Sequence, residues 1–293
     1  MGKSASNLRR HFVRIGAICV IRGPGWNEIG VTGVPDNNRR MESVPGRERA
    51  VIVAGLIAIA ALCWAWIIPM ARDMYGPMSG LSAWMMTATW DAKHLLLLWA
   101  MWAVMMAGMM LPTAVPLLLV YGTAVRRSEA APRAARRVYL LAAGYLVVWS
   151  AFSVGATLLQ RLLSRQFLLT PMMESARPMA TASFLLLAGL YQLTPLKWAC
   201  LKTCRSPLSV IMQRWRPGSS GAFYMGLEHG LYCLGCCWAL MLLLFAGGVM
   251  NLTVITALTG LVLVEKATPF GPQAARLSGV VFIGWAIWLV VTR

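Results

Sequence analysis

The chain has 293 residues, of which 58% are hydrophobic and only 13% are charged, and its formal net charge is +17. This balance excludes a disordered chain and an ordinary nucleic-acid-binding protein, so no nucleic-acid partner is expected. With 19 methionines, 13 tryptophans and a mean hydropathy of +0.64, the composition instead indicates a membrane protein.

The first 49 residues differ from the rest of the chain. They carry nine Lys and Arg among Gly, Pro, Asn and Ser, without apolar periodicity. We expect residues 1–49 to be a basic leader that is disordered or untranslated, because Met41 lies shortly before the first long apolar run and could be the true start. N-terminal sequencing of the natively expressed protein would test this hypothesis. Residues 50–293 then form one transmembrane helical domain.

Apolar runs without charges recur from residue 50 onward. About 20 such residues cross the hydrocarbon core of a bilayer, and inside it only a helix satisfies the backbone of a single segment. The fold class expected is therefore all-α, a polytopic transmembrane bundle of about seven spans. The runs are 50–71, 95–125 (bent by Pro112 and Pro116), 138–160, 179–196, two within 230–264 that are separated near Gly247, Gly248 and Asn251, and 277–292.

Basic residues in the loops predict the orientation. If the N-terminus is cytoplasmic, 21 of the 27 Lys and Arg lie inside and six lie outside, as the positive-inside rule requires. We therefore expect a multi-pass membrane protein with its N-terminus in the cytoplasm. The segment 72–94 then faces outward, where Trp84 and Trp90 could lie at the interface.

Soft metal ligands share one face of the fifth predicted span. A thiolate, an imidazole and a thioether together suit Cu(I) best and zinc second. The alternative is that Cys and Met only pack as small or flexible apolar side chains. At helical spacing the face carries Met225, His229, Cys233, Cys236, Cys237 and Met241.

Glu228 and His229 stand within the same predicted helix. An ionised group inside a span costs about 2.5–3.5 kcal/mol on insertion scales, so a partner is expected. Glu228 either bonds to a neighbouring helix or reaches toward the inner surface near Arg216. The functional alternative is a proton relay or a ligand set shared with Glu265.

Methionines form stripes on the second predicted span. Ten of the 19 lie between residues 70 and 110, including Met74, Met78, Met85 and Met86 of the outward segment. Thioethers at this spacing could pass a soft monovalent ion, and the rise per residue places the stripes at the depth of the cysteine face. Core packing is the alternative. The stripes are Met101, Met105 and Met109 on one line and Met106 and Met110 on the next.

Cys200 and Cys204 lie four residues apart, just past the cytoplasmic end of the fourth predicted span. The basic neighbours of this pair favour the thiolate form, which suits metal hand-over to the cytoplasm. An interfacial helix with incidental cysteines is the alternative. Cys19 and Cys63 have no polar neighbours and are expected to be inert.

Several short motifs together resemble a known family. They are Met-Trp-Ala-Val-Met-Met-Ala-Gly-Met-Met-Leu-Pro at 101–112, Gly144-Tyr145 with Trp149 and Phe152, Tyr-Gln-Leu-Thr-Pro-Leu-Lys at 191–197 with Cys200 and Cys204-Arg205, Gly230, Cys-Leu-Gly-Cys-Cys-Trp-Ala-Leu-Met at 233–241, Met250-Asn251 and Glu265-Lys266. Over about residues 51–291 the chain resembles bacterial integral membrane proteins described as predicted metal-binding proteins of unknown function. The resemblance implies an inner-membrane protein with a cysteine-centred metal site and brings no known reaction.

These observations favour a membrane protein that handles Cu(I) by transport, delivery or storage, rather than an enzyme. Its expected partners are the bilayer, a soluble metal chaperone or recipient protein, and further copies of the chain. A membrane thiol-disulfide oxidoreductase is the alternative, because Cys233 and Cys236 have Cys-x-x-Cys spacing. The predicted topology counts against it, since Cys200 and Cys204 would face the reducing cytoplasm. A copper or haem oxidoreductase is weakened because only His94 and His229 lie in or beside the spans.

Overall fold

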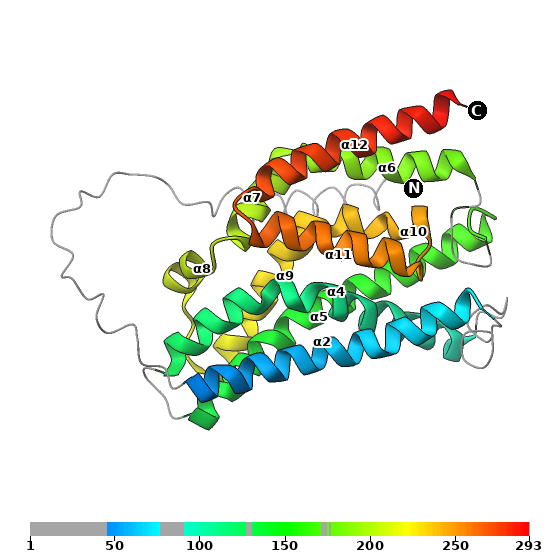
Figure 1. Ribbon diagram of the computed structural model, residues 1–293. Helices are drawn as coiled ribbons and strands as arrows, with labels where there is room; N and C mark the ends of the chain where they lie inside the picture. Colours follow the sequence, from blue (N-terminus) through cyan, green and yellow to red (C-terminus); the bar gives the residue numbers. More distant parts are fainter. Residues whose placement is uncertain (1–45, 77–90, 127–130, 171–174, 176, 293) are drawn as a thin grey trace, which may run out of the picture.

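A computed structural model describes residues 46–76, 91–126, 131–170, 175 and 177–292, which are almost entirely helical. This confirms the predicted all-α class (Figure 1). The helices are α2 (Gly46–Met74), α4 (Ala92–Arg126), α5 (Ala131–Arg165), α6 (Pro178–Gln192), α7 (Pro195–Cys204), α8 (Pro207–Arg214), α9 (Gly218–Leu242), α10 (Leu244–Gly247), α11 (Leu252–Ala267) and α12 (Gly271–Val291).

Five of these helices are long and apolar enough to cross a membrane, or six if the bent pair α6 and α7 counts as one span. The predicted count of seven is not confirmed. One reason is that α11 has only 16 residues, fewer than the roughly 20 that a hydrocarbon core needs. The second predicted span is a single continuous helix that includes Pro112 and Pro116.

The fourth predicted span is not a continuous helix. It is broken after Gln192, and α7 leaves α6 at an angle of 67°. The break has a local cause, because Pro195 has no N–H to continue the hydrogen-bond ladder of α6 and is well suited to the first turn of a new helix. Thr194 caps α7 by accepting a hydrogen bond from the backbone N–H of Lys197. The bend turns α7 back against α9.

α5 packs between α9 and α4, and α2 lies along α4, while α6 and α12 run side by side on the other side of the bundle (Figure 1). Glycines allow the closest helix contacts. A Cβ added at Gly226 of α9 would meet the carbonyl oxygen of Leu141, and one at Gly144 of α5 would meet that of Phe223. Small residues of this kind let helix backbones approach in membrane bundles.

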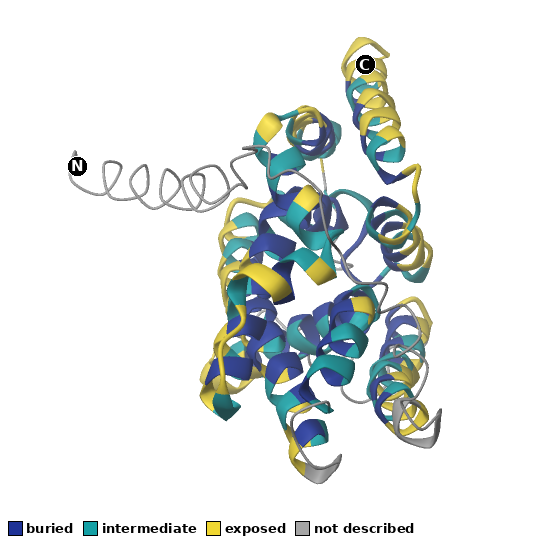
Figure 2. Cartoon of the chain, turned by 90° about the vertical axis from the view of Figure 1, so that its left-hand side faces the viewer, coloured by how far each residue is buried: buried dark blue, intermediate teal, exposed yellow. Residues whose placement is uncertain are grey.

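Buried residues concentrate along the centre of the bundle, whereas the outer faces of α2 and α12 expose large apolar side chains (Figure 2). Leu62 and Trp288 have exposed fractions of 70% and 59%. Extended apolar surface of this kind is unusual on a soluble monomer. The fold is therefore compatible with a membrane protein.

Some expectations fall on residues outside the described ranges. They concern the leader and its possible start at Met41, Cys19, and the outward segment with Met78, Trp84, Met85, Met86 and Trp90. They stay predictions.

Candidate metal centre

α9 presents its cysteines to the interior of the bundle. Cys233, Cys236 and Cys237 are each 1% exposed and their thiols are free. The Sγ atoms of Cys236 and Cys237 donate to the backbone carbonyl oxygen of Cys233 at 3.1 and 2.9 Å. One helical turn thus gathers three thiol side chains, as the sequence spacing predicts.

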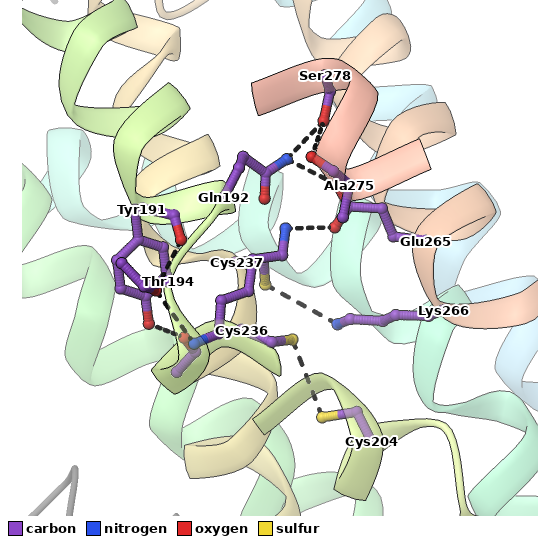
Figure 3. A network of polar contacts seen from close by, with 12 residues as sticks. Tyr191, Gln192, Thr194, Cys204, Cys236, Cys237, Glu265, Lys266, Ala275 and Ser278 are labelled. Atoms are coloured by element: carbon purple, nitrogen blue, oxygen red, sulfur yellow. Dashed lines mark hydrogen bonds and ion pairs between the residues drawn. The ribbon is translucent and has the colours of Figure 1, made fainter. Parts of the chain in front are cut away.

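Cys204 joins this group from a second helix. Its Sγ lies 4.0 Å from Sγ of Cys236, because the bend after Gln192 brings the end of α7 against α9 (Figure 3). With metal–sulfur bonds of about 2.3 Å, two sulfurs on one ion lie from about 3.8 Å apart in tetrahedral geometry to about 4.6 Å in linear geometry. The pair Cys204 and Cys236 therefore has the separation of two thiolates on one metal ion.

Cys233 contacts two polar side chains that sequence reasoning missed as site residues. Nζ of Lys266 on α11 lies 2.8 Å from its Sγ, and the hydroxyl of Tyr145 on α5 lies 2.9 Å from it. Lys266 is also 3.9 Å from Sγ of Cys237 and 3.4 Å from Oγ1 of Thr113. The only signal in the sequence was that Tyr145 and Lys266 stand in the motifs that carry the family resemblance.

His229 lies one turn before Cys233 on α9 and is buried. Its ring lies 6.0 Å from that of Tyr145, and its Nδ1 has no hydrogen-bond partner among the described residues. A buried nitrogen without a partner is costly, so Nδ1 of His229 is a candidate atom for a bond to a ligand. His229 lines a small cavity of about 60 Å³ together with Cys204 and Lys266.

Glu265 does not offer its carboxylate to this cavity. Its Oε2 accepts from Nζ of Lys197 at 2.6 Å, and its Oε1 accepts from Nε2 of Gln192 at 2.7 Å (Figure 3). Gln192 also donates to Ser278 of α12, and Arg205 donates to the backbone carbonyl oxygen of Glu265 at 2.8 Å. Glu265 therefore ties together α6, α7 and α11, with α12 joined through Gln192.

Glu228 forms ion pairs with Arg214 and, at 3.8 Å, with Arg216. This agrees with the alternative in which Glu228 bonds to a neighbouring helix or reaches toward Arg216. Both of these ion pairs lead away from the thiols, toward α8 and the segment that follows it.

The methionines of α4 are fully buried in the bundle core. Their link to the thiols passes through a backbone atom, because the hydroxyl of Tyr145 bonds both the Met110 carbonyl oxygen, at 3.0 Å, and Sγ of Cys233. Tyr145 of α5 thus lies between the methionine stripes and the cysteine face. The sequence predicted only that both lie at the same depth in the membrane, not which helix lies between them. The buried methionines of the predicted set are Met101, Met105, Met106, Met109 and Met110 on α4, and Met225 and Met241 on α9.

Cys200 is fully buried and is not among the free thiols of the described residues. It lines a separate apolar cavity of about 200 Å³ with Phe152, Tyr191 and Trp238. The predicted pair of Cys200 and Cys204 is thus divided between two cavities. Cys63 is a free thiol on α2.

The described residues hold no cluster of three or more His, Cys, Asp or Glu side chains close enough for a metal ion. Hydrogen bonds account for this arrangement, since Lys266 and Tyr145 engage Cys233, and Cys237 turns to the Cys233 carbonyl. What the helices bring together is the two-thiol pair, with His229 and two more thiols nearby.

Comparison with known proteins supports a copper-related role. Residues 99–289 match a family described as PpoB2, copper chaperone. This range includes α5 to α11 and hence Cys204, Cys233, Cys236 and Cys237. No curated protein and no solved structure matches the chain.

Proposed function

The chain belongs to the PpoB2 copper chaperone family, and from this premise we propose that it is an integral membrane protein that binds Cu(I) as cargo and passes it on. Soft thiolates and thioethers prefer Cu(I) to harder cations. Five helices with the length and apolar character of membrane spans support the membrane location. Zinc is the second metal that the same ligands would accept.

One observation carries the proposal: Cys204 and Cys236, from two helices, hold their sulfurs 4.0 Å apart. Two free thiols at this distance can share one ion, because two metal–sulfur bonds of about 2.3 Å can span this separation. Metal exchange also needs few ligands, because a site that passes an ion on must release it. A two-thiol site is therefore suited to transient binding.

Further ligands lie within reach of this pair. Cys233, Cys237 and His229 lie within about three turns of α9. The Nδ1 atom of His229 has no hydrogen-bond partner among the described residues. We propose that these residues exchange with the pair as copper moves. Cys200 and the accessory residues Met225, Met241, Glu228 and Glu265 are more remote candidates. Cys200 lines another cavity, and the carboxylates of Glu228 and Glu265 are paired with Arg214 and Lys197.

The experiment is a Cu(I) competition titration of the purified protein in detergent, under reducing and oxygen-free conditions, against a chromophoric Cu(I) chelator. The wild type is expected to bind copper, whereas Cys204→Ser and Cys236→Ser should weaken binding by at least tenfold. Cys63→Ser is the matched control, because Cys63 is a free thiol on another helix. Copper binding that survives both α7 and α9 substitutions would refute the site.

A parallel zinc titration identifies the preferred metal. If the wild type binds neither copper nor zinc, the proposed function is wrong. A disulfide between Cys233 and Cys236 that forms and exchanges with quinone would instead support the thiol-disulfide oxidoreductase.

A further inference from the structure

A groove opens along α7 and the start of α12, and its lining includes Arg205, the residue that follows Cys204. It has a volume of about 600 Å³ and is lined by Trp198, Leu201, Lys202, Arg205, Ser206 and Pro272, together with Ala199. Volumes of this size accommodate small organic ligands. None of the residues assigned above to copper binding lines this groove.

The groove is cationic. Its lining contains Lys202 and Arg205 and no acidic residue. Lys202 is exposed and makes no ion pair within the described part of the chain. A third cation stands beside it, since the guanidinium of Arg276 lies 4.8 Å from the centroid of the Trp198 ring. A cleft lined by one sign of charge concentrates ligands of the opposite sign.

Arg205 connects this groove to the thiols. It lines both the groove and the small cavity that contains Cys204, His229 and Lys266. Arg205 is held in place by its hydrogen bond to the Glu265 carbonyl oxygen. The Arg205 guanidinium packs closely against Gly271, because a Cβ added at Gly271 would collide with Nη1 of Arg205 and with the carbonyl oxygen of Glu265. Arg205 therefore borders both the open groove and the cavity that contains the free thiol of Cys204.

We propose that this groove is the docking site for the copper donor, and that the donor is an anionic complex of Cu(I) with a small thiol rather than the free cation. The inference depends on the proposed function. The charges support it, since Lys202, Arg205 and Lys266 would repel a free cation and attract a complex whose two thiolates and carboxylates outweigh the single charge of copper. Cys204 is the first thiol that such a complex meets.

The transfer is a ligand exchange without oxidation or reduction. One bond between Cu(I) and a carrier sulfur breaks as a bond between Cu(I) and Sγ of Cys204 forms. The proton of the Cys204 thiol passes to the released carrier thiolate, so that the carrier leaves as a neutral thiol group. Cys236, 4.0 Å away, then replaces the second carrier sulfur in the same manner.

The test compares two copper donors of opposite charge. Oxygen-free stopped-flow mixing of the purified protein in neutral detergent measures the rate of copper uptake from the anionic glutathione complex of Cu(I) and from the cationic acetonitrile complex, with the remaining donor copper trapped by a chelator. Lys202→Glu is expected to slow uptake from the glutathione complex about tenfold at low salt, and much less at high salt. It should not slow uptake from the acetonitrile complex. Lys202→Gln, which only removes the charge, should give an intermediate rate, and Arg72→Glu, an exposed charge reversal on α2, should change neither rate.

Equal slowing with both donors, or no slowing with either, would overturn the proposal. So would an effect of Lys202→Glu that appears only in bilayer discs with anionic phosphatidylglycerol, because the groove would then bind a lipid headgroup. Equilibrium copper affinity, measured on the same samples, separates this result from the proposed function. That function fails when affinity is absent in the wild type, whereas the donor proposal fails when affinity is normal and the rates do not depend on donor charge.

Discussion

The Glu265 carboxylate on α11 accepts a 2.6 Å hydrogen bond from Nζ of Lys197 on α7, and both side chains are almost completely buried. Because α7 ends at Cys204, this ion pair also fixes the helix that delivers one thiol of the pair proposed to bind copper. Gln192 and Arg205 bond to the same residue, so the geometry of the bend depends on Glu265.

Glu265→Gln should therefore lower both stability and copper binding. It leaves a buried ammonium group without its counter-charge, and breaking a buried pair in this way costs about 3–5 kcal/mol. Thermal unfolding in detergent and the Cu(I) titration measure the two effects. The double variant Glu265→Gln with Lys197→Met removes both charges and should be more stable than Glu265→Gln alone. Additive losses in the double variant would show that the two residues act independently.

Tyr145→Phe tests the link between α5 and the thiols. The substitution keeps the ring but removes the hydroxyl that bonds Cys233 and the Met110 carbonyl oxygen. The expected loss is about 1 kcal/mol of stability, typical of one net hydrogen bond, with a several-fold weaker Cu(I) affinity because Cys233 is no longer oriented. Tyr139→Phe, at a more exposed position of the same helix, is the control and should change neither quantity. Wild-type affinity in Tyr145→Phe would exclude an orienting role.

Helix class and the shared face of the α9 cysteines could be predicted from the sequence, since both follow from local spacing. The meeting of Cys204 with Cys236 could not. The run 179–196 has no charged residue and predicts one span, yet Thr194 and Pro195 break it and redirect α7 by 67°. The N-cap Thr194 and the first helical residue Pro195 thus set the direction of α7, which brings Cys204 next to Cys236.

The polar partners of the thiols were likewise beyond sequence reasoning. In the sequence, Lys266 is one more basic residue at a helix end that is predicted to be cytoplasmic, and its contact with Cys233 joins residues 33 positions apart. Glu265 was expected as a possible ligand, but its carboxylate is occupied by Lys197 and Gln192. Such pairings depend on how α11 packs against its neighbours. The spacing of apolar residues in the sequence does not predict that packing.

Gly226→Ala should destabilise the contact between α9 and α5. The new methyl group would lie on the Leu141 carbonyl oxygen, and the two helices must separate to admit it. We expect a loss of about 1–3 kcal/mol, as for other overpacked interiors. Gly155→Ala is the matched control on α5, because a Cβ there meets nothing within 4 Å and alanine favours the helix by about 0.5–1 kcal/mol. Unfolding temperatures in detergent should therefore shift in opposite directions, and equal shifts would contradict the close approach.

The methionine stripes require a variant that separates copper transfer from packing. Met105 and Met109 are fully buried, and leucine has nearly the same volume, so the double substitution Met105→Leu with Met109→Leu should cost less than about 1.5 kcal/mol per site. If the thioethers relay Cu(I), as the sequence stripes predict, vesicles containing the variant should take up or release copper several-fold more slowly. Binding stoichiometry in detergent should stay unchanged, because the pair formed by Cys204 and Cys236 is intact. Ile67→Leu, a swap of buried apolar side chains on α2, controls for altered packing. Wild-type rates in the double variant would show that these methionines only fill the core.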